Sequence, residues 1–379
     1  MVQMWDVVGG SSTGGIQVRE GKALSSPVAP KRLSTDALVK EVELDGQRLH
    51  YKLVAGAGPE QGWVSVTVKG RELLQKMPAT SAQKCPSMRV FVIGGTGYIG
   101  RALVGRLLAD GHTVLGLARN EASATALRSL GVEPRLIPDG FADVSAISAA
   151  AGECDAVVDV AAHQAELSPA VMGIRRALAP GKILLSTTGG LVYGDVPESK
   201  AAPVAESHAK PIEFEASVLK ASEEGLRTCI LRPPWVYGAG GGGMGDFSSR
   251  IPAVKQMGCS PWIDDGREGE ISVVHVRDLA DLYVLALGAL ASNELPSGSL
   301  LNAASGKVSH KAIAESLAGA CGGLPVVAVS PAKAMENGWP WDIWTSSVVN
   351  VLYSTRAHKL GWQPNRTPIT EELSRLSKL

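Results

Sequence analysis

Three glycines in the spacing G-x-x-G-x-x-G lie between an apolar run at residues 90–93 and a helical pattern of apolar residues over 99–108. This order predicts a strand, a tight glycine turn and a helix in immediate succession. Such a turn lets the backbone approach a pyrophosphate, and the N–H groups at the start of the helix attract the anion. We therefore predict a dinucleotide-binding loop; the alternative is a glycine-rich turn without a ligand. The residues assigned to this loop are Gly94, Thr96, Gly97, Tyr98, Ile99 and Gly100.

A charged residue near the end of the next predicted strand bears on which dinucleotide binds. Residues 113–117 form that strand, and Arg119 follows where an NAD enzyme usually carries an acid for the ribose 2′-hydroxyl. A guanidinium suits a 2′-phosphate because it forms paired, charge-assisted hydrogen bonds. We therefore predict NADP as the cofactor, with NAD less favoured. The alternative is that Arg119 is a solvated surface residue.

Two segments resemble one family. The loop, with Thr96 and the pair Tyr98-Ile99, is similar to that of the extended, atypical short-chain dehydrogenase/reductase superfamily, in its NAD-dependent epimerase/dehydratase-like group. Residues 232–238, Arg-Pro-Pro-Trp-Val-Tyr-Gly, resemble the segment with which members of this group leave the cofactor domain. The resemblance covers roughly residues 88–379. It implies an α/β fold: a Rossmann-type doubly wound parallel sheet with a smaller C-terminal substrate lobe.

The resemblance also implies roles for residues beyond the loop. A residue just after a predicted strand over 134–137 is placed near the adenine. The turn after a strand that begins at residue 156 lies against the pyrophosphate and the nicotinamide ribose in relatives, and the segment after residue 232 closes over the nicotinamide. These likenesses add Asp139, Ala161, Ala162 and Pro233 to the predicted cofactor residues.

The family's catalytic residues are only partly recognisable. A strand over 182–188 runs toward Tyr193-Gly194, which is similar to the family's serine-rich strand end. Counted back from Tyr193, the position of the catalytic serine or threonine falls on Gly189, one place after Thr188. Relatives carry a Tyr-x-x-x-Lys pair further on, but no tyrosine lies between Tyr193 and Tyr237. The usual proton donor is therefore missing.

A positioned proton donor commonly contributes about a hundredfold to ten-thousandfold to the rate, so strong catalysis requires a replacement. A histidine after the strand that begins at residue 156 could serve, although a lone histidine there is more often a hydrogen-bonded structural residue. The predicted catalytic candidates are Thr188, Tyr193 and His163, and His208 is also conceivable.

Two functions follow. The first is an NADP-dependent oxidoreductase of the atypical epimerase/dehydratase-like group that acts on a small carbonyl or alcohol metabolite, because the nicotinamide itself carries the hydride chemistry. The alternative is a catalytically silent NADP(H)-binding redox sensor or regulatory protein similar to the NmrA-like group, which the missing Tyr-x-x-x-Lys pair favours. A sensor must bind NADPH and NADP⁺ with different affinities, because only differential affinity shifts a conformational equilibrium.

Residues 1–77 require a separate interpretation. Short β-like runs punctuated by glycine, with a hairpin signal at Asp45-Gly46, resemble a small SH3-like β-barrel of the bacterial type. This module could bind a protein partner or pack as a cap. A linker at 78–87 leads to the epimerase/dehydratase-like domain at 88–379, where 88–235 mainly bind the cofactor and 236–379 mainly form the substrate lobe. In that lobe, Asp278 is predicted to cap the helix that follows it.

Composition and charge narrow the classes of partner. The 379 residues include 37 Lys or Arg and 37 Asp or Glu without a long run of either sign, so we predict no nucleic-acid surface. The five cysteines are scattered without a C-x-x-C pair, which predicts free thiols, a reducing compartment and no metal site. No run of about eighteen apolar residues appears. We therefore predict no membrane span, a cytoplasmic location and a small-molecule substrate.

Overall fold

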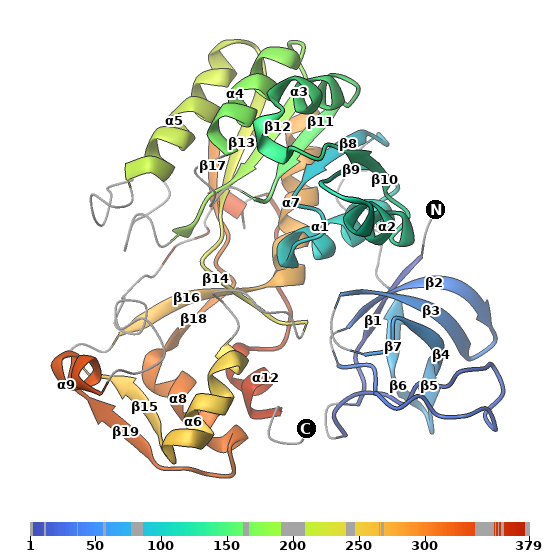
Figure 1. Cartoon of the computed structure of the whole chain (residues 1–379), viewed down its shortest axis with the longest axis vertical. Helices are drawn as coiled ribbons and strands as arrows, with labels where there is room; N and C mark the ends of the chain where they lie inside the picture. Colours follow the sequence, from blue (N-terminus) through green and yellow to red (C-terminus); the bar gives the residue numbers. More distant parts are fainter. Residues whose placement is uncertain are drawn as a thin grey trace.

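The computed structural model describes residues 3–10, 13–35, 37–55, 58–76, 86–161, 167–190, 209–239, 247–264, 266, 269–337, 352, 354, 356–357 and 360–375. Figure 1 shows three parts: an α/β domain at the top, a smaller C-terminal lobe at the lower left and a β-rich N-terminal module at the lower right. No helix within these ranges is long and apolar enough to cross a membrane.

A seven-stranded parallel sheet forms the centre of the α/β domain. Its strands are β8 (Arg89–Ile93), β9 (Thr113–Ala118), β10 (Glu133–Leu136), β11 (Ala156–Asp159), β12 (Ile183–Thr187), β13 (Arg227–Arg232) and β17 (Ser299–Asn302). They lie in the order β10-β9-β8-β11-β12-β13-β17. The predicted Rossmann-type sheet and α/β fold class are thus confirmed. The order reverses between β8 and β11, and in such sheets ligands bind outside the carboxyl ends of the strands at this point.

Helices cover both faces of the sheet. One face carries α1 (Tyr98–Ala109), α2 (Glu121–Ser129) and α7 (Val276–Ala291), and the other carries α3 (Val144–Gly152), α4 (Leu167–Ala177) and α5 (Ala209–Glu223). Side chains of β8 alternate between the two cores: Val90 and Val92 pack on the α1 side, whereas Phe91 and Ile93 pack on the α3 side. Because both faces are buried, the central strands have nearly continuous apolar sequences.

The C-terminal lobe is built on two small sheets. β14 (Trp235–Tyr237), β16 (Glu270–His275) and β18 (Gly306–Ser309) form one, and β15 (Ser260–Ile263) and β19 (Val326–Val329) form the other. Pro233 and Pro234 separate β13 from β14, because a proline cannot donate a hydrogen bond within a sheet. Among its described residues, the lobe contains the helices η4 (Phe247–Arg250), α6 (Ile251–Met257), α8 (His310–Ala320), α9 (Pro331–Glu336) and α12 (Ile369–Arg375).

The N-terminal module is a small all-β region, as predicted. Its five-stranded antiparallel sheet has the order β4-β3-β2-β1-β7, formed by β1 (Met4–Val7), β2 (Leu38–Asp45), β3 (Arg48–Ala55), β4 (Gln61–Ser65) and β7 (Leu74–Lys76). Two short strands, β5 (Thr67–Val68) and β6 (Arg71–Glu72), form a further hairpin. Asp45 pairs with Arg48, so β2 and β3 turn at residues 46–47, where Gly46 has φ of +56°. The assignment to the SH3-like class and the domain boundaries stay predictions.

Helix α7 begins differently from the prediction. Its N-cap is His275, whose Nδ1 accepts a hydrogen bond from the backbone N–H of Arg277 at 3.2 Å. Asp278 lies inside the first turn, where its carboxylate accepts hydrogen bonds from the backbone N–H groups of Asn365 (3.2 Å) and Arg366 (3.3 Å). The prediction that Asp278 caps the helix was therefore wrong, because residues distant in the sequence occupy its carboxylate.

Candidate functional site

The glycine loop between β8 and α1 has a geometry that only glycine permits. Gly94 has φ of +86°, a left-handed conformation that is unfavourable for side-chain-bearing residues. A Cβ added at Gly100 would lie 2.0 Å from the carbonyl oxygen of Gly94, and one at Gly97 would lie 3.2 Å from the same oxygen. The Gly97 N–H donates to that oxygen at 2.9 Å. The loop is therefore held tight against the end of β8.

The N-terminus of α1 faces this loop. Gly97 is the N-cap, and no side-chain hydrogen bond caps the helix there among the described residues. The first N–H groups of a helix lack intrahelical acceptors and carry the positive end of the helix dipole, so they are suited to bind a pyrophosphate. The structure thus brings the predicted residues Gly94, Thr96, Gly97, Tyr98, Ile99 and Gly100 together at the turn between β8 and α1.

The end of β11 forms the other side of the turn. A Cβ at Gly94 would lie 3.2 Å from the Cβ of Ala161, so the two segments are in close contact. Asp159 is fully buried, and its Oδ1 accepts a hydrogen bond of 2.8 Å from the N–H of Ala161. Burial raises the pKa of Asp159 to about 7. Two predicted residues that follow, Ala162 and His163, lie outside the described residues.

Arg119 and Asp139 follow the paired neighbouring strands β9 and β10. Both are exposed after the ends of β9 and β10. A Cβ at Gly140, the first residue of the short helix η1 (Gly140–Ala142), would lie 3.0 Å from Cδ of Arg119, so the aliphatic part of Arg119 rests on this glycine. Because Arg119 is exposed, its guanidinium could bind a phosphate.

Thr188 is buried directly after β12, and its hydroxyl has a strong acceptor. Thr188 Oγ1 donates to Glu215 Oε1 at 2.6 Å. Arg232 holds the same carboxylate through two hydrogen bonds, from Nε at 3.0 Å and from Nη2 at 2.9 Å. For Thr188 to donate to a substrate carbonyl, as predicted, it must first give up its bond to Glu215. Tyr193 and His208, the other hydroxyl and imidazole candidates near this strand, lie outside the described residues.

Tyr283 of α7 adds a second buried hydroxyl beneath the same strand ends. Thr187 Oγ1 donates to the carbonyl oxygen of Asp159 at 2.6 Å and lies 2.5 Å from the Tyr283 hydroxyl. Burial raises the pKa of Tyr283 well above its usual range, so its phenol stays protonated. Neither Tyr283 nor the Glu215–Arg232 pair was predicted from the sequence. A signal was present for Glu215, an acid that interrupts the apolar pattern of a helix.

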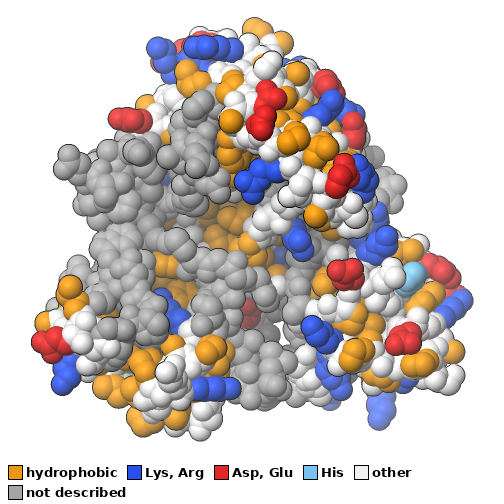
Figure 2. Space-filling model, viewed as in Figure 1, with side chains coloured by type: hydrophobic (Ala, Val, Ile, Leu, Met, Phe, Trp, Pro, Cys, Tyr) orange, Lys and Arg blue, Asp and Glu red, His pale blue; other side chains and the backbone are white. Residues whose placement is uncertain are grey.

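The segment after β13 connects the loop to the C-terminal lobe. Pro233 is buried, and its carbonyl oxygen accepts a hydrogen bond from the N–H of Gly190 at 2.8 Å. The hydroxyl of Tyr98, in the glycine loop, donates to the carbonyl oxygen of Gly238 at 2.7 Å. In the space-filling view, the molecule is hollowed between the α/β domain and the lower lobe, with hydrophobic side chains at the floor of the hollow (Figure 2).

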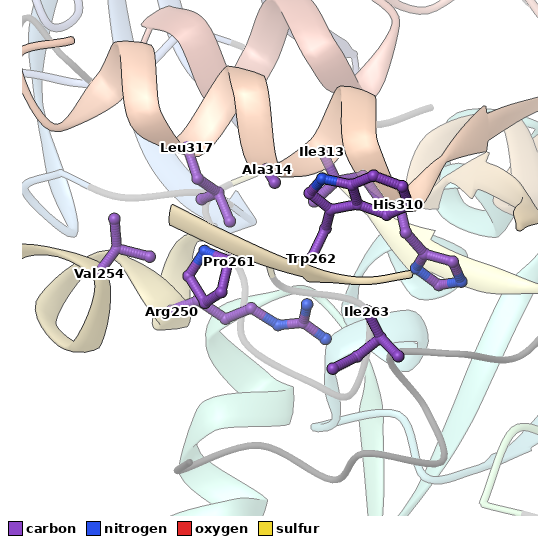
Figure 3. Close-up of a pocket in the computed structure, with 9 residues that line it drawn as sticks. All are labelled: Arg250, Val254, Pro261, Trp262, Ile263, His310, Ile313, Ala314 and Leu317. Carbon is purple, nitrogen blue, oxygen red and sulfur yellow. The ribbon is translucent and has the colours of Figure 1, made fainter. Parts of the chain in front are cut away.

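A small pocket lies in the C-terminal lobe, between η4, α6, β15 and α8. Arg250, Trp262 and His310 supply its polar and aromatic groups, and apolar residues such as Val254 and Ile313 supply the rest. Figure 3 shows Arg250 and Ile263 on one side of β15, Trp262 on the opposite side, and His310 extending from α8 toward the end of the strand. Burial lowers the pKa of Arg250 to about 10, a value at which the guanidinium is still charged near neutral pH. The pocket therefore keeps one charged side chain, Arg250, among its lining residues.

Cysteine and metal-ligating residues do not converge in the part of the chain that the structure describes. Cys154, Cys229, Cys259 and Cys321 are free thiols. No group of three His, Cys, Asp or Glu side chains in these ranges is arranged to hold a metal ion.

Comparisons with known proteins agree with this geometry. The model of the NAD dependent epimerase/dehydratase family matches residues 90–299. An uncharacterized protein of Schizosaccharomyces pombe is 30% identical over 308 residues, which are 76% of this chain and 98% of that protein. The 4-hydroxy-2-methyl-3-oxo-4-farnesyl-3,4-dihydroquinoline-1-oxide ketoreductase of Stigmatella aurantiaca is 30% identical over 226 residues, 52% of this chain and 64% of that enzyme.

A solved structure shares the fold. The UDP-glucose 4-epimerase of Thermus thermophilus, in complex with NAD, superposes with a TM-score of 0.56 at 23% sequence identity. The match covers 76% of this chain and 98% of the epimerase. The part of this chain outside the match is about as long as the N-terminal module.

Proposed function

Because this chain belongs to the NAD dependent epimerase/dehydratase family, a group of NAD(P)-dependent enzymes, we propose that it is an NADP-dependent oxidoreductase acting on a small carbonyl or alcohol metabolite. The observation that carries this proposal is the glycine loop, closed so tightly that a Cβ at Gly100 would lie 2.0 Å from the Gly94 oxygen, with Arg119 directly after the neighbouring strand β9. The ketoreductase name of the Stigmatella aurantiaca relative supports carbonyl reduction.

The residues of the loop would hold the cofactor along its length. The pyrophosphate would bind at the N-terminus of α1, and Arg119 would bind the 2′-phosphate through charge-assisted hydrogen bonds while Asp139 lies near the adenine. Ala161, Ala162 and Pro233 would lie toward the nicotinamide ribose. When bound, the nicotinamide supplies the hydride chemistry, so the protein needs to orient the substrate and move one proton.

Three residues are proposed to move that proton. Thr188 donates to Glu215 at 2.6 Å, which favours Tyr193 and His163 over Thr188 as the donor to a carbonyl oxygen. The substrate would occupy the hollow between the two lobes, with the pocket at Arg250 and His310 binding an anionic or polar end.

The free, scattered cysteines support a cytoplasmic location with reduced thiols.

Hydride transfer is the test. Purified protein is mixed either with NADPH and a panel of small ketones and aldehydes, or with NADP⁺ and the corresponding alcohols. The fall or rise in absorbance at the nicotinamide band is followed. Turnover that is lost in Tyr193→Phe or in His163→Ala, while NADPH binding is kept, identifies the proton donor. If the protein binds NADPH but reduces no carbonyl and oxidises no alcohol in the panel, the oxidoreductase proposal is wrong.

A specific observation favours a second candidate. The Thr188 hydroxyl is bonded to Glu215, and the sequence lacks a Tyr-x-x-x-Lys pair, which together fit a catalytically silent NADP(H)-binding sensor. The N-terminal module would then contact a protein partner. Exposed apolar side chains on this module suit such a contact, namely Leu24, Val28, Val42 and Val68. A sensor requires that NADPH and NADP⁺ bind with different affinities and change partner binding; equal affinities would exclude it.

A further inference from the structure

Asp6 in β1 of the N-terminal module binds two arginines from the rest of the chain. Its Oδ1 accepts from Nη1 of Arg277, in the first turn of α7, and its Oδ2 accepts from Nη1 of Arg366, just before α12. The side chains of Asp6 and Arg277 are 6% and 2% exposed. Removing a partner from such a buried pair is strongly destabilising, because it leaves an uncompensated charge. The contact therefore joins the module firmly to the cofactor domain.

The same two arginines lie within a network around the first turn of α7. Arg366 donates its backbone N–H to Asp278, and the indole Nε1 of Trp362 donates to the carbonyl oxygen of Asp278 at 2.8 Å. The backbone N–H of Arg277 donates to His275 Nδ1 at 3.2 Å. Asp6 thus binds the side chain of Arg277, whose backbone N–H contacts the His275 ring, while Nε2 of that ring lies 3.2 Å from Glu372 Oε1.

His275 is packed directly against the segment that contacts the glycine loop. Its ring lies edge-on to Tyr237, with centroids 5.4 Å apart and planes at 87°. A Cβ at Gly238 would lie 2.2 Å from the His275 ring, so glycine alone fits there. The carbonyl oxygen of Gly238 accepts the 2.7 Å hydrogen bond from the hydroxyl of Tyr98, the first residue of α1.

These contacts form a continuous path from Asp6 through Arg277, His275 and Gly238 to Tyr98. Ala102 of α1 and Val276 and Ala280 of α7 pack together in one apolar cluster alongside this path. A shift in the first turn of α7 would therefore move both the Gly238 carbonyl and the surface on which the start of α1 rests.

We propose that Asp6 is a positioning residue for dinucleotide binding. By neutralising Arg277, it holds the first turn of α7 and the His275 ring, which keep the Gly238 carbonyl in place for Tyr98 and so set the N-terminus of α1 at the pyrophosphate. The N-terminal module is then a structural part of the cofactor site. This inference rests on the dinucleotide binding in the proposed function, and is independent of the choice of NADP over NAD and of the chemical step.

A double-mutant cycle tests the path, because only coupled residues give non-additive effects. Asp6→Asn, Tyr98→Phe and the double variant are compared with the wild type by calorimetric titration with NADPH and NADH, at a temperature where circular dichroism shows each variant folded. We expect each single change to raise the dinucleotide Kd about twofold to thirtyfold. The Kd of the double variant should be little higher than that of the single variant with the higher Kd. Unchanged affinity in Asp6→Asn, or effects that multiply in the double variant, would overturn the inference.

Asp45→Asn is the matched control. It removes the same charge from the same module, where Asp45 pairs with Lys22 at the exposed turn between β2 and β3. We expect this variant to bind the cofactor as tightly as the wild type. Equal weakening in Asp45→Asn and Asp6→Asn would assign the effect to net charge and overturn the inference.

A second variant covers the case in which Asp6→Asn does not fold. Asp6→Asn combined with Arg277→Gln removes both charges of the pair, which is far less destabilising than leaving one buried charge alone. The same loss of affinity is expected, and wild-type affinity would overturn the inference. If the wild type binds neither dinucleotide, the proposed function fails and the inference with it. If the wild type binds and the variants match it, the inference alone fails.

Discussion

Thr188 donates its hydroxyl hydrogen to Glu215 at 2.6 Å, beneath the carboxyl end of the sheet where a catalytic hydroxyl is expected. Arg232 holds the other lone pairs of this carboxylate, so the three side chains form one buried unit. Because Glu215 already accepts the Thr188 hydroxyl hydrogen, we predict that Thr188 is chiefly structural and is the least favoured of the three candidate proton donors.

Thr188→Val is therefore predicted to change stability more than activity. Losing a hydrogen bond to a charged acceptor should lower the free energy of unfolding by about 1.5–3 kcal/mol, measured by urea denaturation. Glu215→Gln should lower the free energy of unfolding further, by about 3–5 kcal/mol, because it breaks a buried ion pair and leaves the charge of Arg232 uncompensated. A Thr188→Val protein with wild-type stability and a hundredfold lower kcat would instead show that Thr188 acts in catalysis.

Gly100→Ala is predicted to abolish tight dinucleotide binding. The added methyl group would lie 2.0 Å from the Gly94 oxygen, so the loop must open. This change should lower the free energy of unfolding by about 1–3 kcal/mol. Gly319→Ala in α8 is the matched control, because a Cβ there meets nothing within 4 Å. This control should bind the cofactor normally and gain up to about 1 kcal/mol from helix propensity. Normal NADPH affinity in Gly100→Ala would exclude the loop as the binding site.

A contact in this site could be predicted from the sequence only where the contacting residues lie close together along the chain. The glycine loop was accessible because the strand, turn and helix are contiguous, and the G-x-x-G-x-x-G spacing reflects contacts within seven residues. The pairing of Glu215 with Arg232 joins a helix to a strand and depends on how α5 packs on β13. The docking of Asp6 on Arg277 spans 271 residues, and no local pattern signals it.

The start of α7 shows the same limit. Asp is a preferred N-cap residue, which is why Asp278 was predicted for that role. In the fold its carboxylate is occupied by backbone N–H groups 87 and 88 residues away, and His275 caps the helix instead. Local propensity was outweighed by tertiary contacts that the sequence order does not reveal.

The contribution of Asp159 to the stability of the protein is predicted to fall as pH rises from about 4 to 7. Burial raises the pKa of this carboxyl from 3.8 to about 7. In this window the folded protein keeps a proton that the unfolded chain has released, so the free energy of unfolding decreases with pH. Roughly three pKa units correspond to about 4 kcal/mol. Asp159→Asn should therefore be more stable than the wild type at pH 8 and close to it near pH 4.

Urea titrations at pH 4.5 and pH 8 measure this difference. Asp155→Asn provides a control of opposite sign, because a hydrogen bond from Lys182 lowers the pKa of Asp155. The stabilisation from Asp155 is present above its unfolded pKa and is lost as pH falls, so Asp155→Asn should be less stable than the wild type at pH 8. A difference between Asp159→Asn and the wild type that stays constant with pH would contradict the account of Asp159.

Arg250→Gln is predicted to raise the KM for an anionic or polar carbonyl substrate at least tenfold, because Arg250 lines the pocket in the C-terminal lobe. The affinity for NADPH should be unchanged. Lys255→Gln removes the same charge from the exposed face of α6 and serves as the control. Steady-state kinetics with saturating NADPH distinguishes the two variants. An equal KM in Arg250→Gln and the wild type would remove this pocket from the substrate site.

The central claim is that Arg119 selects NADP. Charge-assisted hydrogen bonds to a phosphate contribute about 1.5–3 kcal/mol, which corresponds to about ten- to hundredfold in affinity. Arg128→Asp on the exposed face of α2 is the control for the change in charge, because the Arg128 side chain is exposed and pairs with Glu121 at 3.2 Å.

The most direct measurement is the ratio of the Kd values for NADH and NADPH, by calorimetric titration of the wild type, Arg119→Asp and Arg128→Asp. We predict that the wild type and Arg128→Asp bind NADPH at least tenfold more tightly than NADH, and that Arg119→Asp loses this preference. A wild-type protein that binds NADH as tightly as NADPH would contradict the claim and make Arg119 a surface residue without a role in the cofactor site.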